Sequence, residues 1–153
     1  MSELRSRPLF TLRMALHPIQ DLGLTPHGHR RVVPVAGGSF AGPRLRGAVL
    51  AHAGGDWLLE RADGSFQQDV RLTLQADDGA LILMTYRGVR IASPEVSAQL
   101  ARGEEVPVDR YYLRTAPLFE TSAAAHAWLN GIVSVGVGER RTDGVVYEVF
   151  EIL

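Results

Sequence analysis

Hydrophobic and polar residues alternate along most of the chain, and this alternation predicts β-strands with one buried face. Residues 10–16 read FTLRMAL, with the largest hydrophobic side chains at the even positions. In residues 66–75, Val70, Leu72 and Leu74 share one face of the predicted strand, and the polar residues between them share the other. About eight or nine strands are predicted in this way, over residues 10–16, 31–35, 45–51, 57–61, 66–75, 80–90, 111–116, 132–137 and 145–152.

Turns that contain glycine separate the predicted strands. Asp-Gly pairs stand at residues 63–64, 78–79 and 143–144, and such pairs favour tight hairpins because glycine readily adopts the left-handed conformation. A glycine-rich stretch covers residues 37–57. Glycine within strands is typical of bends, bulges and close contacts between backbones. We therefore expect this stretch to form the corners of a curved antiparallel sheet.

Two short helices are expected between strands. Ser93 is a candidate N-cap with Pro94 at the first helical position, and Gly103 stands just beyond the end of that helix. A second helix is expected over residues 123–130, capped by Thr121 or Ser122, with a glycine at position 131 as its stop.

The overall pattern predicts a mainly β fold. The chain of 153 residues has the size of one domain, and its many short strands at regular spacing are typical of a sandwich or a barrel. No internal repeat or low-complexity segment interrupts the pattern. We expect residues 1–153 to form a single domain with two short helices.

Composition excludes several functional classes. Sixteen arginines, with no lysine, are balanced by 17 acidic residues for a net charge of −1, which argues against nucleic acid as a partner. The absence of cysteine excludes disulfides, thiolate catalysis and zinc–cysteine sites. The sequence has no apolar run long enough for a transmembrane helix and no visible secretory signal. We therefore expect a cytoplasmic bacterial protein that does not act at a membrane.

Short motifs follow one another in a distinctive order along nearly the whole chain. They begin with GHRRVVPV at residues 28–35 and GGSFAGP at residues 37–43, and continue with Asp56-Trp57 and DDGA at residues 77–80. Further matches lie at residues 103–104, 111–112, 114–115, 119–121 and 128–130. These motifs resemble a bacterial and fungal family, domain-of-unknown-function family 3237. The resemblance implies a closed antiparallel β-barrel of calycin-like size and no agreed reaction.

A polar cluster is the strongest candidate for catalysis. Asp69 and Arg71 lie two residues apart on one predicted strand, and Arg114 stands near Tyr112 on another. If these side chains and Tyr86 point into the barrel, the arginines would orient a carboxylate or enolate and a tyrosine would donate a hydrogen bond. Asp69 would then act as the general base. The alternative is that these residues form an ordinary solvated strand face.

A second group of residues is a candidate for binding a ligand. Trp57 and Trp128 are the largest side chains of the chain and would stack on a planar molecule. Tyr86 would line the same pocket, and Asp56 would either face the barrel mouth as a second acid or cap a turn. The alternative for both tryptophans is that they close the ends of the barrel as core residues.

Metal and nucleotide chemistry have little support in the sequence. His27 and His29 would share one strand face but lack an evident third ligand, and His126 is expected at the surface. The sequence carries no P-loop, no dinucleotide-binding glycine motif and no serine-hydrolase elbow. We therefore expect neither a metal site nor a cofactor.

Three functions remain open. We favour an enzyme that needs no cofactor, namely an isomerase, cyclase or lyase that acts by proton transfer on a hydrophobic carbonyl or carboxylate compound, for example an aromatic or polyketide-like one. The second is a lipocalin-like carrier or sensor, which would have an apolar lumen with the charges outside. The third is a structural protein whose barrel is filled. Apolar strand residues such as Ile132, Val133, Val135 and Val137 also suggest a homodimer.

Overall fold

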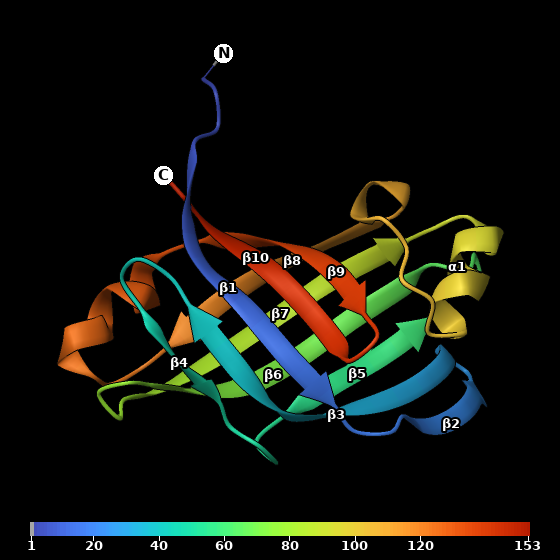
Figure 1. Ribbon diagram of the computed structural model, residues 1–153, viewed down its shortest axis with the longest axis horizontal. Coiled ribbons are helices and arrows are strands. Elements are labelled where there is room, and N and C mark those ends of the chain that lie inside the picture. The colour runs from blue at the N-terminus through green and yellow to red at the C-terminus, as the bar shows by residue number, and fades with distance from the viewer. Residues whose placement is uncertain (1) are drawn as a thin grey trace.

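Ten strands, one α-helix and two 3-10 segments build one barrel in the computed structural model, which describes residues 2–153 (Figure 1). The strands are β1 (Ser6–Leu16), β2 (Gln20–Thr25), β3 (Gly28–Ala41), β4 (Arg46–Val49), β5 (Gly55–Glu60), β6 (Phe66–Ala76), β7 (Leu81–Ile91), β8 (Tyr112–Glu120), β9 (Ser134–Arg141) and β10 (Gly144–Ile152). The helical segments are α1 (Pro94–Ala101), the single turn η1 (Val108–Arg110) and the 3-10 helix η2 (Ala124–Gly131).

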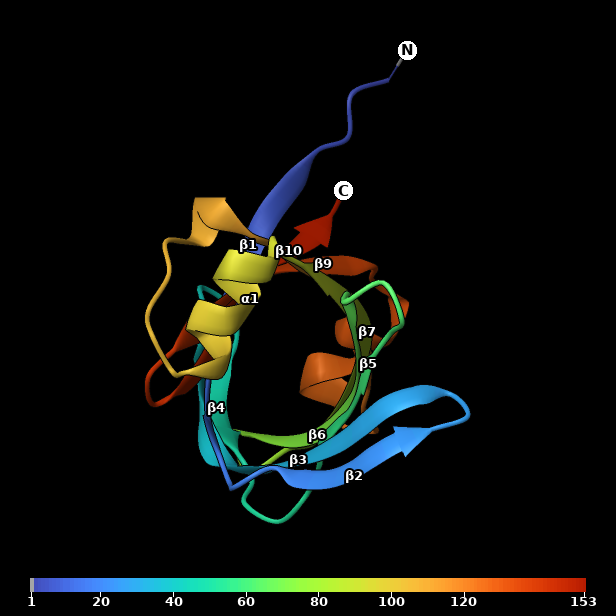
Figure 2. The same ribbon diagram turned by 90° about the vertical axis from the view of Figure 1, so that its right-hand side faces the viewer.

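The sheet closes on itself because its first and last strands pair. All pairings are antiparallel, in the order β1-β10-β9-β8-β7-β6-β4-β3, and β1 also pairs with β3 to complete the ring. The strands β4 and β5 share one position between β3 and β6, so the wall has eight strand positions. Figure 2 shows this ring with the hairpin of β2 and β3 extending beyond it.

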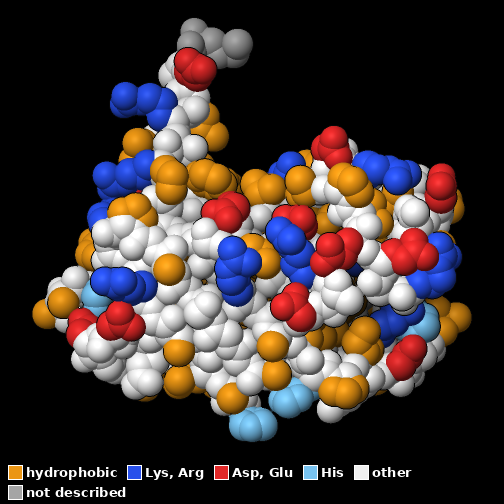
Figure 3. Space-filling view, viewed as in Figure 1, with side chains coloured by type: hydrophobic (Ala, Val, Ile, Leu, Met, Phe, Trp, Pro, Cys, Tyr) orange, Lys and Arg blue, Asp and Glu red, His pale blue; other side chains and the backbone are white. Residues whose placement is uncertain are grey.

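The barrel is filled unevenly along its length. In the half next to η2, Phe10 packs against Phe40 and Phe119 with ring centroids 5.3 and 5.9 Å apart. Leu72, Leu74, Ile82, Met84 and Leu129 are almost fully buried in the same half. The half next to α1 carries buried polar side chains and forms the site described below. Solvent-facing charges of both signs are interspersed on the face shown in Figure 3.

The glycine-rich stretch brings strand backbones close together, as predicted. A Cβ atom added at Gly38, Gly42, Gly47 or Gly54 would overlap a backbone carbonyl oxygen of a neighbouring strand. These positions therefore accept only glycine without a shift of the wall.

The mainly β barrel, its Asp-Gly hairpins and the first helix are confirmed. Gly64, Gly79 and Gly144 have positive φ, and the Ser93 hydroxyl accepts a hydrogen bond from the Val96 amide as the N-cap of α1. The second helix differs, because η2 is a 3-10 helix that begins after Ala123 and has no side-chain cap. The strand β2 was not predicted. None of the helices in residues 2–153 is long and apolar enough to span a bilayer.

Candidate functional site

The half of the barrel next to α1 encloses a cavity of about 60 Å³. One side of this cavity is apolar and includes Met14, Val33, Val35, Val70, Leu113 and Val145. Six polar side chains from five strands complete the lining, namely Asp56, Gln68, Tyr86, Arg90, Arg140 and Tyr147. We call these six residues the lumen cluster.

Asp56 enters the lumen from β5 and alters the strand pairing beside it. Its Oδ1 accepts a hydrogen bond of 3.0 Å from the backbone amide of Asp69 on β6. The β5–β6 ladder is interrupted opposite this point, at Trp57 and Leu58. Burial raises the pKa of the Asp56 carboxyl to about 6, although the amide hydrogen bond partly opposes the rise. Asp56 therefore changes its protonation state close to neutral pH.

Tyr86 and Tyr147 face each other beside Asp56. Their ring centroids lie 5.5 Å apart in an edge-to-face arrangement. Burial, followed by the neighbouring tyrosine and Asp56, raises the pKa of Tyr86 well above its usual range. Burial and Asp56 likewise raise the pKa of Tyr147. Both phenols therefore stay protonated and are available as hydrogen-bond donors.

Two arginines complete the polar wall. The guanidinium carbon of Arg90 lies 4.2 Å from the centroid of the Phe66 ring, and burial together with the charge of Arg140 lowers the pKa of Arg90 to about 10. The backbone amide of Arg140 donates a hydrogen bond of 2.8 Å to the hydroxyl of Tyr111, which ties this part of β9 to the residue before β8. Within residues 2–153, neither arginine forms an ion pair with a carboxylate.

A surface cleft of about 430 Å³ lies next to the cavity. It runs between the β1–β2 connection and the β9–β10 turn. Leu16, Ile19, Val33 and Arg140 line both the cleft and the cavity. These shared residues mark the entrance to the lumen, and the side chain of Arg140 stands at that entrance.

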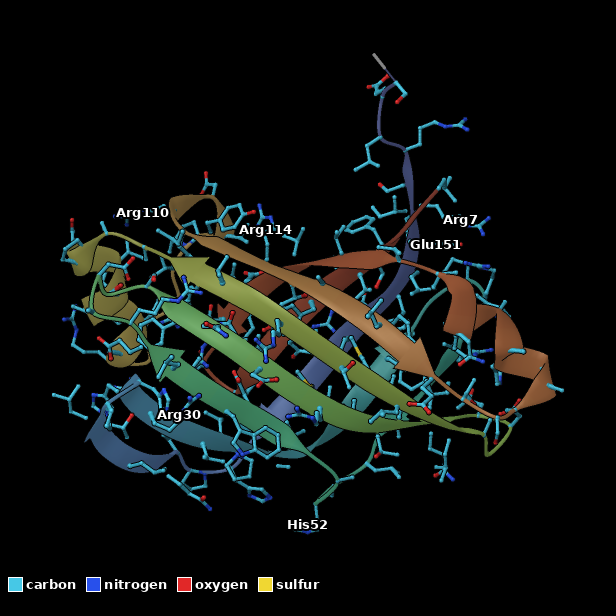
Figure 4. The ribbon with its side chains drawn as sticks, turned by 180° about the vertical axis from the view of Figure 1, so that it is seen from behind. Arg7, Arg30, His52, Arg110, Arg114 and Glu151 are labelled. Atoms are coloured by element: carbon cyan, nitrogen blue, oxygen red, sulfur yellow. The ribbon has the colours of Figure 1, made fainter. Side chains whose placement is uncertain are left out.

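The four candidate catalytic residues lie on the outer wall of the barrel, which matches the alternative of a solvated strand face and not the inward orientation that the catalytic role requires. The Asp69 carboxylate lies 3.7 Å from Arg71 and 3.8 Å from Arg87 on the outside of β6 and β7. The Arg114 guanidinium carbon lies 4.7 Å from the ring centroid of Tyr112, which is 49% exposed. Figure 4 shows Arg114 on the outer side of β8. The inward positions of β6 and β8 belong to the buried residues that alternate with these four, most of them hydrophobic.

The four predicted ligand-binding residues divide into two pairs. Asp56 and Tyr86 face the lumen together. Trp57 is 39% exposed on the outer wall, where the guanidinium carbon of Arg71 lies 5.5 Å from its ring centroid. Trp128 belongs to η2 at the far end of the barrel, where it packs partly buried against the core.

The histidines take no part in the lumen. His27 lies in the β2–β3 turn, and His29 contacts Asp21 at 2.6 Å. His126 is less exposed than expected, because its side chain is only 12% exposed and contacts Asp78 at 2.7 Å. Residues 2–153 contain no group of three or more histidine, aspartate and glutamate side chains that could hold a metal ion.

Sequence reasoning missed four members of the lumen cluster: Gln68, Arg90, Arg140 and Tyr147. Each lies in phase with the buried residues of its own strand, as Gln68 does with Val70 and Leu72. For Gln68, Arg90 and Tyr147 the signal is a polar group in phase with a hydrophobic strand face. Arg140 gives no such signal, because the buried positions in its phase on β9 are Ser134, Gly136 and Gly138.

Comparison with known proteins gives relatives along the whole chain. A UPF0311 protein of Rhodopseudomonas palustris is 31% identical over 150 residues, which cover 98% of this chain and 97% of that protein. A crystal structure of a conserved protein of unknown function from the same species has a TM-score of 0.95 at 30% identity and covers 100% of both chains.

Two further solved structures share the barrel. A β-barrel-like protein from Acinetobacter baumannii has a TM-score of 0.85 at 35% identity, covering 100% of this chain and 98% of that one. A structure described as an enzyme from Penicillium herquei has a TM-score of 0.75 at 22% identity, covering 100% and 97% of the two chains, and this likeness shows the fold. The model of a family described as protein of unknown function (DUF3237) matches residues 4–152, and the chain therefore belongs to the DUF3237 family.

Proposed function

We propose that the lumen binds a small organic carbonyl or carboxylate compound and that Asp56 transfers a proton to or from it. The observation that carries this proposal is a carboxyl group of pKa about 6 facing a cavity. A general acid or base works best when its pKa lies near the working pH. Perturbed carboxyl groups in a cavity are also typical of active sites.

The surrounding residues suit the chemistry of an enolate. In this scheme the Asp56 carboxylate takes a proton from the carbon next to a carbonyl, and the electron pair of that C–H bond moves onto the carbonyl oxygen. Tyr86, Tyr147 or an arginine would stabilise the resulting negative charge by hydrogen bonding. Return of the proton at another atom completes an isomerisation, and ring closure or loss of a group gives a cyclisation or an elimination.

The space available limits the size of the enclosed part of the ligand. The cavity of about 60 Å³ has room for only about four to six water-sized groups. The adjoining cleft of about 430 Å³ falls within the range of small-molecule sites. We infer that the reacting end of the ligand enters the cavity and that its apolar remainder lies in the cleft, against Leu16 and Ile19.

Hydrogen exchange at carbon provides a test that needs no known substrate. A panel of ketones and keto acids is incubated with the protein in D₂O, and loss of the proton signal next to the carbonyl is followed by NMR. We expect exchange with the wild-type protein and its loss in Asp56→Asn. The matched variant Asp69→Asn should exchange like the wild type, since that carboxylate lies outside. Exchange that survives in Asp56→Asn and disappears in Asp69→Asn would refute the assignment.

A carrier or sensor without catalysis is the second candidate. Asp69 and Arg71 lie outside the barrel, and this position favours a carrier over an enzyme in which Asp69 is the general base. The charged lumen speaks against it, because a simple carrier of hydrophobic ligands was expected to have an apolar interior. Binding of a panel member, seen as a rise in Tm, with no exchange at carbon for any member would support the carrier.

A further inference from the structure

The lumen holds more positive than negative charge. Arg90 and Arg140 both line the cavity, and Asp56 is the single carboxylate among its lining residues. Glu60, an acid whose charge acts on Arg90, is already paired with Arg31 at 2.8 Å. The buried Arg90 guanidinium forms no ion pair with a carboxylate within residues 2–153, which raises the free energy of the empty site, and an anionic ligand would lower it.

The lumen also contains two polar atoms that have no hydrogen-bond partner. Gln68 is 5% exposed, and its Oε1 accepts no hydrogen bond within residues 2–153. The Nε of Arg90 is likewise buried without an acceptor. Buried polar groups are nearly always satisfied in native proteins. One orphan acceptor and one orphan donor are therefore available on the cavity wall to a ligand that supplies both complements.

The two orphan groups lie on one side of the cavity. Gln68 pairs across the β6–β7 ladder with Gly88, and Arg90 is the next inward residue on β7. Such diagonal neighbours have Cβ atoms about 7 Å apart. A Cβ at Gly88 would lie 2.6 Å from the Arg114 carbonyl oxygen, 2.7 Å from Thr115 and 3.0 Å from Oε1 of Gln68, so only glycine fits between β8 and the Gln68 side chain. Apolar residues such as Val33 and Val35 line the remainder of the cavity.

We infer that the lumen selects small organic anions that also carry a hydroxyl group, such as hydroxycarboxylates. The anionic oxygen pairs with Arg90 and Arg140, the hydroxyl donates to Oε1 of Gln68, and the apolar skeleton extends past Val33 into the adjoining cleft. This inference names the ligand class of the lumen and rests on the proposed function only for ligand binding there. It does not require that Asp56 transfers a proton.

Three probe molecules of similar shape separate the contribution of the ligand's charge to binding from that of its hydroxyl group. They are 3-hydroxybenzoate, benzoate, which lacks the hydroxyl, and 3-hydroxybenzamide, which lacks the charge. Their affinities are measured by isothermal titration calorimetry. For the wild-type protein we expect 3-hydroxybenzoate to bind about tenfold more tightly than either analogue, since a hydrogen bond or charge contact of this kind changes affinity by about that factor. Equal affinities for the three probes, or no binding of any probe, would overturn the inference.

Four variants assign each contribution to a residue. Gln68→Leu and the less disruptive Gln68→Met should abolish the advantage over benzoate alone. Arg90→Met should abolish the advantage over the benzamide alone. Arg87→Gln is the matched control, because Arg87 lies on the same strand with its side chain 72% exposed outside, and it should bind like the wild type. Unchanged preferences in folded Gln68→Met and Arg90→Met, verified by near-UV circular dichroism, would refute the assignment.

The outcomes keep this inference separate from the proposed proton transfer. Selective binding of 3-hydroxybenzoate with no exchange at carbon in any carbonyl compound supports the ligand class and refutes catalysis by Asp56. Exchange at carbon that depends on Asp56, together with equal affinities for the three probes, supports catalysis and refutes the ligand class.

Discussion

Replacing Asp56 by asparagine is expected to stabilise the protein at neutral pH while removing its proposed activity. Burial raises the pKa of this carboxyl from its ordinary value of 3.8 to about 6. Between these two values the folded state binds more protons at Asp56 than the unfolded state does. The stability that the protonated form contributes is therefore complete below pH 3.8 and is lost as the pH rises through 6. Asparagine cannot ionise and so does not suffer this loss.

The size of the effect follows from the size of the rise in pKa. Each tenfold change in the acid dissociation constant corresponds to about 1.4 kcal/mol of free energy. The rise in pKa from 3.8 to about 6 therefore means that ionising Asp56 costs roughly 3 kcal/mol more in the folded state than in the unfolded chain. Asparagine has nearly the same shape as the protonated acid, and its Oδ1 can still accept the hydrogen bond of the Asp69 amide. We therefore expect Asp56→Asn to match the wild type near pH 3.5 and to be about 3 kcal/mol more stable at pH 7.5.

Urea unfolding at a series of pH values measures this difference directly. The free energy of unfolding of the wild type, Asp56→Asn and Asp69→Asn is determined between pH 3.5 and 7.5. Asp69→Asn loses only contacts of 3.7 and 3.8 Å to exposed arginines, which are worth about 0–1 kcal/mol. A difference between Asp56→Asn and the wild type that is constant with pH, or that shrinks as the pH rises, would refute the reasoning.

Three other predictions concern packing, an ion pair and association. Gly47→Ala should destabilise the barrel by about 1–3 kcal/mol in urea unfolding, because its Cβ would overlap the β6 backbone; Gly131→Ala, with open space around it, is the control and should change little. Glu151→Gln should lower Tm by about 3 °C in calorimetry, because the carboxylate contacts Arg7 at 2.8 Å and also contacts Arg44, and an unchanged Tm would contradict this. We expect a homodimer by light scattering that Val133→Asp converts to a monomer, since this valine is 60% exposed; a monomeric wild type would end that prediction.

The predictable part of the fold is the part in which burial imposes a pattern on the sequence. Strand β6 was predicted within one residue of its bounds, because Val70, Leu72 and Leu74 alternate with polar residues and all three are buried. Strand β2 was missed because it pairs only with β3 outside the ring. Its Leu22 and Leu24 are 58% and 85% exposed, so no buried face shaped its sequence. A strand that pairs without being buried shows little alternation of hydrophobic and polar residues.

The candidate site was harder to predict, because chemical character and strand phase gave conflicting indications. Asp69 and Arg71 form a suggestive pair, yet they alternate with the buried valine and leucines of β6 and must therefore point outward. Arg90 looks like a surface residue by type, but it lies in phase with Met84 and Tyr86 and so faces the lumen. Strand phase was the better guide to location. Which polar atoms of the lumen lack a hydrogen-bond partner could be learned only from the three-dimensional structure.

The pairing of the first strand with the last also determines when the site can form. Leu12 on β1 lies opposite Tyr147 on β10, so nearly the whole chain must be present before these strands meet. Contacts between residues so distant in sequence are closed late and slowly during folding. Tyr147 and Arg140 come from the last strands to be made, whereas Asp56, Gln68, Tyr86 and Arg90 come earlier. The lumen is therefore complete only after β10 has been synthesised and has paired with β1.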